Sequence, residues 1–464
     1  MEGIIKADKL RGVVIWICII GALGGLLFGL DQGFINGSLS FIEKTWHLTV
    51  PEGESYAGIM LIGAVVGAGV SGWISRLIGR KYTLLVACVF FVVFCLWGSI
   101  TNSFEILYWT RFCLGLAVGS ASFVVPIYLS EIAPTRIRGA MISLYQFFIT
   151  LGIFLIYFSN AWIGAEYHSW RLMLGVIAVP AAITLILVFF VPKTPRWLML
   201  KKRDDEAKKV LVKTLNSEKE VSNEIKEINE SLKLGNKLKS INSLKMFGKS
   251  FFMKVLILGV LLMVFQQLTG INTVIYYSTT IFRDAGFSDP AVATILVGLT
   301  NMLATILAIA FIDKFGKKPL LYIGLIIMII TLLTIGFMFT QGHDLAAFEQ
   351  IIMLVSTLVF IIGFELSLGP IAWVMCAEIF PLEGREIGVT ITTLTNWVFA
   401  FIVVRFSLTI MNAWGGASLF FIFAGFCIVG IFITKYFIPE TKGVSLEKLE
   451  ANLKNGRKLK SIGA

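Results

Sequence analysis

Twelve long apolar segments dominate this sequence, and they limit its possible folds more than any other feature. Each is long enough to cross the roughly 30 Å apolar core of a bilayer as a helix. In lipid, a helix is the open-chain structure that satisfies its own backbone groups. The sequence therefore predicts an all-α membrane protein with twelve transmembrane helices. The segments cover residues 12–36, 56–75, 82–101, 105–128, 140–160, 171–191, 255–281, 291–312, 319–341, 348–376, 387–411 and 417–437.

Composition and charge agree with this class of protein. Hydrophobic residues make up 57% of the chain and charged residues 15%, which excludes a water-soluble domain of this size. The net charge of +11 lies in short connections and one linker, where it indicates topology and not nucleic-acid binding. Basic residues mark alternate connections, with Lys44, Arg171 and Arg283 as the main exceptions. We therefore expect a multi-pass protein of the plasma (inner) membrane whose termini and linker are both cytoplasmic. The marking residues are Lys6, Lys9, Arg11, Arg76, Arg80, Lys81, Arg136, Arg138, Lys314, Lys317, Lys318, Arg385, Lys435 and Lys442.

Nothing in the sequence indicates a metal, a cofactor or an enzyme active site. The six cysteines all fall in apolar segments and form no CxxC pair. The three histidines, His47, His168 and His343, fall in loops. No nucleotide-binding P-loop is present, which disfavours ATP-driven pumping.

The two halves of the chain repeat each other. Gly79-Arg-Lys corresponds to Gly316-Lys-Lys, the segment beginning Glu131-Ile-Ala-Pro corresponds to Glu378-Ile-Phe-Pro, and Pro192-Lys-Thr corresponds to Pro439-Glu-Thr. Three motifs in one order at a nearly constant separation predict two pseudo-symmetric six-helix bundles with a site between them. The predicted divisions are residues 1–192, a linker of short amphipathic helices over 193–254, residues 255–438, and a tail over 439–464.

The segment Val264–Tyr277 places several amides within one apolar span. Gln266, Gln267 and Asn272 would reach hydrocarbon depth, where unpaired amides are costly. In a straight helix, Asn272 would point roughly 140° away from Gln267, but Gly270 can introduce a break that lets them converge. Such amides often bond neighbouring helices. A cluster around a glycine instead favours a site for an uncharged, polyhydroxylated ligand.

The first span carries an acid beside a stripe of small residues. Gly21, Gly25, Gly29 and Gly33 follow the small-xxx-small spacing of close helix contacts. Asp31 lies off this stripe, and Arg111 is a candidate partner from another span. Such a pair could load and release a proton as the bundles move, or it could be a permanent structural ion pair.

Polar residues also recur at helical spacing in four later spans, where each stripe taken alone is more often a helix contact. The stripes contain Ser143, Gln146, Thr150 and Tyr157, then Thr294, Gly298, Asn301 and Thr305, then Glu365, Gly369 and Trp373, and finally Thr392 and Asn396. Arg405 is expected to lie near the outer face and extend its charge toward water.

Together these motifs resemble the sugar porters of the major facilitator superfamily, in particular the bacterial galactose– and arabinose–proton symporters. The resemblance covers nearly the whole chain, and it includes Leu-Phe-Gly-Leu-Asp31, Pro126-Ile-Tyr-Leu-Ser-Glu131, Gln266-Gln-Leu-Thr-Gly-Ile-Asn and Gly369-Pro-Ile-Ala-Trp373. It implies transport of an aldohexose or aldopentose by alternating access, with Asp31 coupling the proton to the sugar. The sugar positions that it implies, with neighbouring aromatic residues and two further candidates, are Gln146, Gln266, Gln267, Asn272, Asn301, Trp373, Asn396, Phe28, Trp397, Tyr277 and Glu365.

Charged residues on the cytoplasmic side occupy matched places in both halves. They could be solvated loop residues, but their matched placement favours pairs between the halves that close an inner gate when the outer one opens. Arg76 replaces the acidic or neutral residue usual at its place, so the pairing there is open. The predicted gate residues are Arg80, Glu131, Arg138, Arg196, Asp313, Glu378, Arg385 and Glu440.

The sequence thus predicts a monomeric importer whose partners are a monosaccharide, a proton and the bilayer. A passive uniporter is the near alternative, because Glu365 differs from the bacterial symporters and resembles the passive sugar carriers of animals. A sugar sensor is a further alternative, although neither the linker nor the tail offers a signalling domain. The particular monosaccharide stays open.

Overall fold

The computed structural model of the chain describes residues 12–134, 137–240, 243–342, 345–381, 383–442, 444 and 446–463, without the side chains of 231–240, 243–245, 312–313, 377 and 446–447. All regular elements in these ranges are helical, and they provide 12 spans long and apolar enough to cross a membrane. The predicted fold class is confirmed.

The membrane-spanning helices fall into two groups along the chain. The first group is α1 Gly12–Trp46, α2 Val50–Ile78, α3 Arg80–Ile100, α4 Phe104–Ile132, α5 Arg138–Glu166, α6 Trp170–Gly175 and α7 Ala178–Phe190. The second group is α11 Ser250–Leu268, α12 Ile271–Asp284, α13 Pro290–Phe315, α14 Lys317–Thr340, α15 Ala347–Glu365, α16 Leu368–Ile379, α17 Arg385–Trp414 and α18 Gly416–Tyr436.

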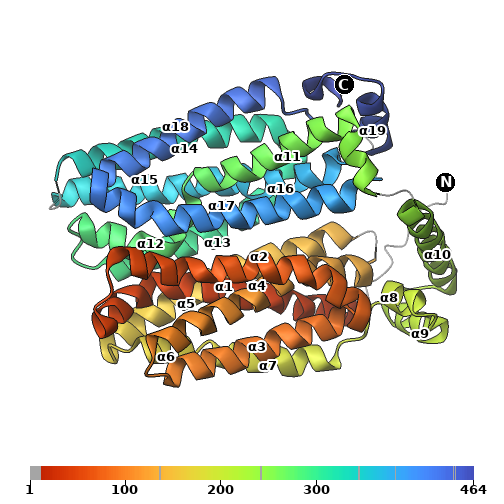
Figure 1. Cartoon of the computed structure of the whole chain (residues 1–464), viewed down its shortest axis with the longest axis horizontal. Coiled ribbons are helices and arrows are strands. Elements are labelled where there is room, and N and C mark those ends of the chain that lie inside the picture. The colour runs from red at the N-terminus through yellow and green to blue at the C-terminus, as the bar shows by residue number, and fades with distance from the viewer. Residues whose placement is uncertain are drawn as a thin grey trace, which may run out of the picture.

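These groups form two halves that lie side by side (Figure 1), with α1–α7 in one and α11–α18 in the other. The helices α8 Pro195–Leu200, α9 Asp204–Thr214 and α10 Glu218–Ser240 stand beyond one end, followed by the 3₁₀ turn Ser243–Gly248. The tail helix α19, Leu446–Lys454, lies at the same end, before the 3₁₀ turn Leu459–Ser461. We call this end the linker side and the opposite end, which carries the α1–α2 and α17–α18 connections, the far side.

The predicted close approach along the first span occurs between α1 and α5. A Cβ atom added at Gly29 would lie 1.9 Å from the carbonyl oxygen of Ile149, and one added at Gly25 would lie 2.5 Å from that of Tyr145. Only hydrogen fits at such contacts. Small residues therefore let these two helices pack backbone to backbone, which is how helices associate where burial from water gives no driving force.

The predicted span 255–281 is divided into α11 and α12. Gly270 stands between them in the left-handed region, with φ +85°. Glycine adopts this conformation without steric cost, so the chain can turn within the membrane-spanning region. A second predicted span, 348–376, is divided into α15 and α16 around Leu366 and Ser367. Interrupted helices of this kind are typical of binding regions in transporters.

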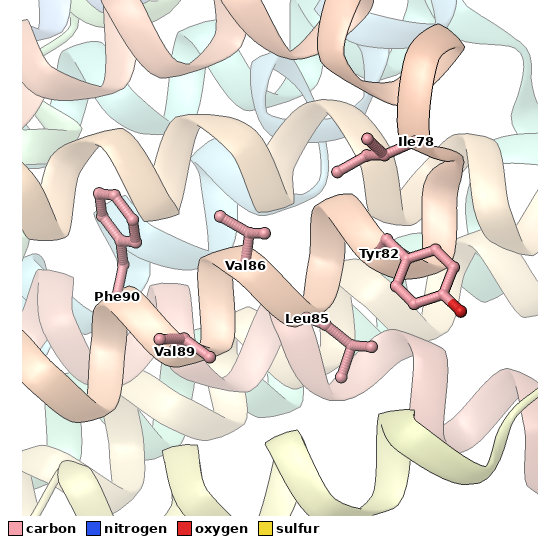
Figure 2. Close-up of a pocket in the computed structure, with 6 residues that line it drawn as sticks. All are labelled: Ile78, Tyr82, Leu85, Val86, Val89 and Phe90. Atoms are coloured by element: carbon pink, nitrogen blue, oxygen red, sulfur yellow. The ribbon is translucent and has the colours of Figure 1, made fainter.

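An apolar groove lies along α3 (Figure 2), away from these breaks. It is lined only by apolar side chains and one tyrosine, several of which are exposed, as expected of a surface that faces lipid tails. The Tyr82 hydroxyl is the one polar side-chain group of this lining, so the groove belongs to the lipid-facing surface. Its lining residues are Ile78, Tyr82, Leu85, Val86, Val89 and Phe90.

Candidate functional site

A chain of side-chain amides crosses from the first half to the second. Gln32 of α1 donates through Nε2 to Asn272 Oδ1 at 3.0 Å, and Asn272 donates through Nδ2 to Gln267 Oε1 at 2.5 Å. Gln267 Nε2 lies 3.4 Å from Gln266 Oε1, which also accepts from Asn396 Nδ2 of α17 at 2.5 Å. The break at Gly270 therefore does bring Asn272 against Gln267. All five amides are buried, so they form a polar layer inside an apolar protein.

Gln266 also fixes the second interrupted span. Its Nε2 donates to the carbonyl oxygens of Leu368 and Gly369, each at 2.9 Å, at the start of α16. One turn further along α16, the Trp373 side chain is 40% exposed. The amide cluster thus positions the helix that carries a predicted sugar-contacting indole.

Aromatic residues meet across the halves beside this layer. Phe28 of α1 and Trp397 of α17 have ring centroids 5.5 Å apart. Tyr277, a predicted ligand contact, donates through its hydroxyl to the Val404 carbonyl oxygen at 2.8 Å, and its side chain is fully buried. In this conformation Tyr277 joins α12 to α17.

Several polar groups near the amides are left available for a ligand. Within the described part of the chain, buried Asn301 Oδ1 and Trp397 Nε1 have no hydrogen-bond partner. Buried polar atoms are almost always paired with protein, water or ligand, so one acceptor and one donor remain to be satisfied. Gln146 of α5 is half-buried on the opposite half.

Glu365 joins the same group of residues. Its Oε2 accepts from the Thr305 hydroxyl at 3.2 Å, and Thr305 in turn lies one turn from Asn301 on α13. The carboxyl group is 4% exposed and lies next to Gly369, whose carbonyl accepts from Gln266. A carboxyl group is thus built into the second-half face of the amide layer.

The predicted partners Asp31 and Arg111 form an ion pair, with Arg111 Nη1 2.5 Å from Asp31 Oδ1. Both side chains are 0% exposed, and the guanidinium stacks near the rings of Phe34 and Tyr56, 5.5 and 5.9 Å from their centroids. Asp31 Oδ2 and two Arg111 nitrogens, Nε and Nη2, have no partner within the described residues. Asp31 and Gln32 are consecutive residues of α1, so the ion pair and the amide chain are anchored to the same turn of this helix.

Comparison with known proteins identifies the family. Residues 17–453 match the family described as "Sugar (and other) transporter". The chain belongs to this family of sugar transporters. The transporter is 42% identical to the galactose–proton symporter of Escherichia coli strain K12 over 457 residues, covering 98% of this chain and 97% of the relative. It is 40% identical to the arabinose–proton symporter of the same strain over 467 residues, covering 98% and 96%.

Solved structures agree with the sequence comparison. An inward-open structure of the xylose transporter XylE from E. coli matches this transporter with a TM-score of 0.80 and 30% identity, covering 94% of this chain and 99% of XylE. The proton:xylose symporter XylE bound to 6-bromo-6-deoxy-D-glucose matches with a TM-score of 0.77 and 31% identity, covering 94% and 98%. The protein is a multi-pass membrane transporter of the major facilitator fold and not an enzyme.

On the far side of the transporter, a buried asparagine joins the halves. Asn36 of α1 donates through Nδ2 to Ser278 Oγ at 2.6 Å and to the Ile275 carbonyl at 2.7 Å, and it accepts from the Thr279 N–H at 2.8 Å. The Tyr157 hydroxyl of α5 donates to the same Ile275 carbonyl at 2.5 Å. These bonds connect α12 to α1 and α5, so the far side is closed at this point.

Several predicted gate charges on the linker side pair within their own halves in this conformation, in which the far side is closed. Pairing between the halves when the far side opens stays a prediction. Arg80 pairs with Glu131 at 3.0 Å inside the first half, and Glu378 pairs with Lys317 inside the second. Arg385 donates to the Phe380 carbonyl at 3.2 Å, also within its own half.

Of three further predicted gate residues, Arg138 and Arg196 contact or belong to the linker, and the side chain of the third, Asp313, lies outside the described part of the chain. Arg138 lies 4.0 Å from Glu224 of α10, so it contacts the linker. Arg196, at the start of α8, also has an interaction partner. The Asp313 side chain and Arg136 fall outside the described part of the chain, as does His343.

Glu440, another predicted gate residue, caps the start of α14. Its carboxylate accepts from the backbone N–H groups of Lys318 at 2.9 Å, Lys317 at 3.3 Å, and Thr441 and Lys442 at 3.0 Å each. Burial raises the pKa of Glu440, but these four backbone donors outweigh it and hold the pKa below its ordinary value. The residue therefore stabilises one half and does not bridge to the other.

Besides the bonds of Asn36, three further cross-half contacts were missed from sequence. Arg76 pairs with Glu386 of α17 on the linker side, although sequence reasoning left its partner open. Gln32 and Glu54 are buried in contact with the second half. Both are polar residues at or beside apolar spans, which is the signal that could have identified them. Arg405, expected to extend toward water, instead lies 3.4 Å from buried Glu54.

Proposed function

We propose that this transporter is a proton-coupled monosaccharide importer that works by alternating access in the plasma membrane. The observation that carries the proposal is the buried amide chain from Gln32 to Asn396, which lies between the halves and beside the Asp31–Arg111 pair. Amides donate and accept at once, as sugar hydroxyls require, and an indole can cover the C–H face of a sugar ring. The names of the related galactose, arabinose and xylose transporters support a hexose or pentose.

The sugar site in this proposal combines groups from both halves. Asn301 Oδ1 and Trp397 Nε1 provide an unpaired acceptor and donor, and Gln146 is a half-buried amide of the first half. Several amides of this chain are already hydrogen-bonded to one another. A bound sugar would therefore replace some of these amide–amide bonds with bonds to its own hydroxyl groups. The proposed contacts are Phe28, Gln146, Gln266, Gln267, Asn272, Asn301, Glu365, Trp373, Asn396 and Trp397, with Tyr277 close behind them.

Asp31 is the proposed proton carrier. Its charge is held by Arg111 in a site from which water is excluded, where the attraction between opposite charges is strong. Protonation cancels that attraction and frees Arg111. Asp31 and Gln32 stand on the same turn of α1, so in this proposal a shift of α1 when the ion pair changes also alters the bond between Gln32 and Asn272 that joins the halves. Proton binding and the contact between halves are thereby linked.

Orientation follows from the basic residues and from the contacts between halves. We place the linker side, with both termini, in the cytoplasm, because lysine and arginine concentrate in its connections. The far side then faces outward and is closed, and the inward-open XylE structure shares this overall shape with a TM-score of 0.80. The proposed units are residues 1–192, a linker 193–254, residues 255–438 and the tail 439–464, acting as a monomer.

Uptake of radiolabelled sugar into proteoliposomes tests the proposal. We expect accumulation above equilibrium only when an inward proton gradient is imposed, and competition by a subset of a panel containing galactose, glucose, xylose and arabinose. Uptake that equilibrates but never exceeds the outside concentration would support a passive uniporter, the alternative that Glu365 leaves open. Binding without uptake would indicate a sensor.

A further inference from the structure

A buried carboxylate of the first half bonds the backbone of a second-half helix on the far side. Glu54 of α2 is 0% exposed. Its Oε1 accepts from the N–H groups of Leu408 at 2.5 Å and Thr409 at 3.0 Å, both in α17. Its Oε2 accepts from the Thr409 hydroxyl and from Arg405 Nη1 at 3.4 Å. One carboxylate thus collects four donors from the opposite half.

The backbone donors are unusual because they belong to the interior of α17. An N–H in a helix ordinarily bonds the carbonyl four residues earlier, which for Leu408 is Val404. Here the Leu408 N–H donates to Glu54, and the Val404 carbonyl, which can accept two hydrogen bonds, accepts from the Tyr277 hydroxyl at 2.8 Å. At this point α17 is therefore hydrogen-bonded both to α12 of its own half and to α2 of the other half.

The negative charge of Glu54 makes its contact with α17 sensitive to the relative position of the halves. A buried carboxylate is stable only while its donors are present, and removing them leaves a costly unpaired charge. Arg405 supplies the counter-charge, and its guanidinium also lies 5.2 Å from the centroid of the Phe406 ring. One turn further along α2, Gly58 packs against Phe401, so the two helices are in close contact here. A small separation of α2 from α17 would break all four bonds together.

We propose that Glu54 is the latch that holds the far side of this transporter closed, with Arg405 as its charge partner. The inference rests on the proposed alternating access, since the halves must separate on the far side to admit sugar from outside. Glu54 is a positioning residue in this account and does not contact the sugar. Its loss shifts the balance between far-side-open and far-side-closed molecules.

Distances between spin labels measure this balance directly. Cysteines placed at Lys44 and Asn412, exposed far-side positions on the two halves, carry the labels after the six native cysteines are replaced by serine. Double electron–electron resonance on the full chain then gives the fractions of open and closed molecules. We expect Glu54→Ala to raise the ratio of open to closed molecules by about tenfold or more, the size expected on losing a charge-assisted hydrogen bond.

Graded variants separate a latch from a general loss of structure. Glu54→Gln keeps an oxygen for the two backbone donors but loses the charge, so its shift should be smaller than that of Glu54→Ala. Arg405→Met should also raise the ratio of open to closed molecules, but by several-fold less than Glu54→Ala does. Glu105→Ala, an exposed glutamate on the far side of α4, serves as the matched control and should leave the distances unchanged.

An unchanged distance distribution in Glu54→Ala protein that still binds sugar would overturn the latch. If both Glu54 variants fail to fold, Arg405→Met decides, and wild-type distances in that variant would overturn it equally. Sugar uptake in the label-free protein is measured in parallel. A transporter that proves to lack proton coupling refutes the proposed function without changing the distances, so the two failures are distinguishable.

Discussion

The two ends of this transporter connect their halves in different ways. On the far side, buried Asn36 and Glu54 each bond backbone groups of the opposite half. On the linker side, the cross-half pair Arg76–Glu386 has side chains 46% and 78% exposed, while Arg80, Glu131, Lys317 and Glu378 pair within their own halves. The difference indicates that charge organises each half as a rigid unit at the linker side, whereas specific buried hydrogen bonds hold the far side closed.

Asp31→Asn should have the largest effect on transport, because it removes the buried charge that pairs with Arg111 and is the proposed proton carrier. We expect sugar exchange across proteoliposomes to persist and accumulation driven by a proton gradient to be lost. Radiolabelled counterflow and gradient-driven uptake measure the two activities. Glu386→Gln, an exposed acid at the linker side, is the control and should accumulate sugar normally. Full accumulation by Asp31→Asn would remove the coupling role.

Gln267→Ala should come next, because it interrupts the amide chain in its middle. The change removes the acceptor of Asn272 and leaves buried amides unpaired, so sugar affinity should fall about tenfold or more. Isothermal titration calorimetry with the transported sugar measures this loss. Gln341→Ala alters an exposed amide at the end of α14 and should bind normally. Equal affinities in both variants would reject the pocket.

Glu440→Gln should have a smaller effect, confined to stability at the linker side. The carboxylate caps α14, so its loss should lower the free energy of unfolding by about 1 kcal/mol at neutral pH. Because the folded-state pKa is lowered, this stabilisation is present above the ordinary glutamate pKa and is lost as pH falls through the folded value.

Thermal melting in detergent across a pH series measures that dependence. The difference between wild type and Glu440→Gln should be constant near neutral pH and shrink in acid. Glu218→Gln, in the exposed first turn of α10, should melt like wild type throughout. A difference that grows in acid would contradict the capping role.

Arg76→Ala should have the smallest effect of all. Exposed ion pairs contribute little and are screened by salt. We expect initial uptake rates within about twofold of wild type, with the difference vanishing at high salt. A large loss of uptake would mean that the linker-side pair controls closure, and it would reverse the comparison between the two sides.

Sequence patterns predicted the fold because membrane-spanning length and hydropathy are local properties of the chain. They also indicated the Asp31–Arg111 pair and the break at Gly270, since a buried acid and a glycine among amides have few structural solutions. These patterns did not separate pairing within a half from pairing between halves, because Arg80, Glu131 and Glu378 reach the same face of the membrane in either case.

Contacts made by the far side were harder to see in the sequence. Glu54 precedes the predicted span 56–75, so it resembled a loop acid, whereas α2 begins at Val50 and buries it. Its partners in α17 lie more than 350 residues away in the chain. Nothing near Glu54 in sequence specifies that a distant helix will offer its backbone donors, and only the packing of two complete halves does so.

Sugar-induced movement of protons tests the central claim most directly. Proteoliposomes with wild-type protein, weakly buffered outside and containing no sugar, are given galactose, xylose or arabinose without an imposed gradient while the outside pH is recorded. The account predicts that a transported sugar makes the outside medium more alkaline, and that Asp31→Asn abolishes this change while sugar still enters. Sugar entry by the wild type with no change in pH would contradict it.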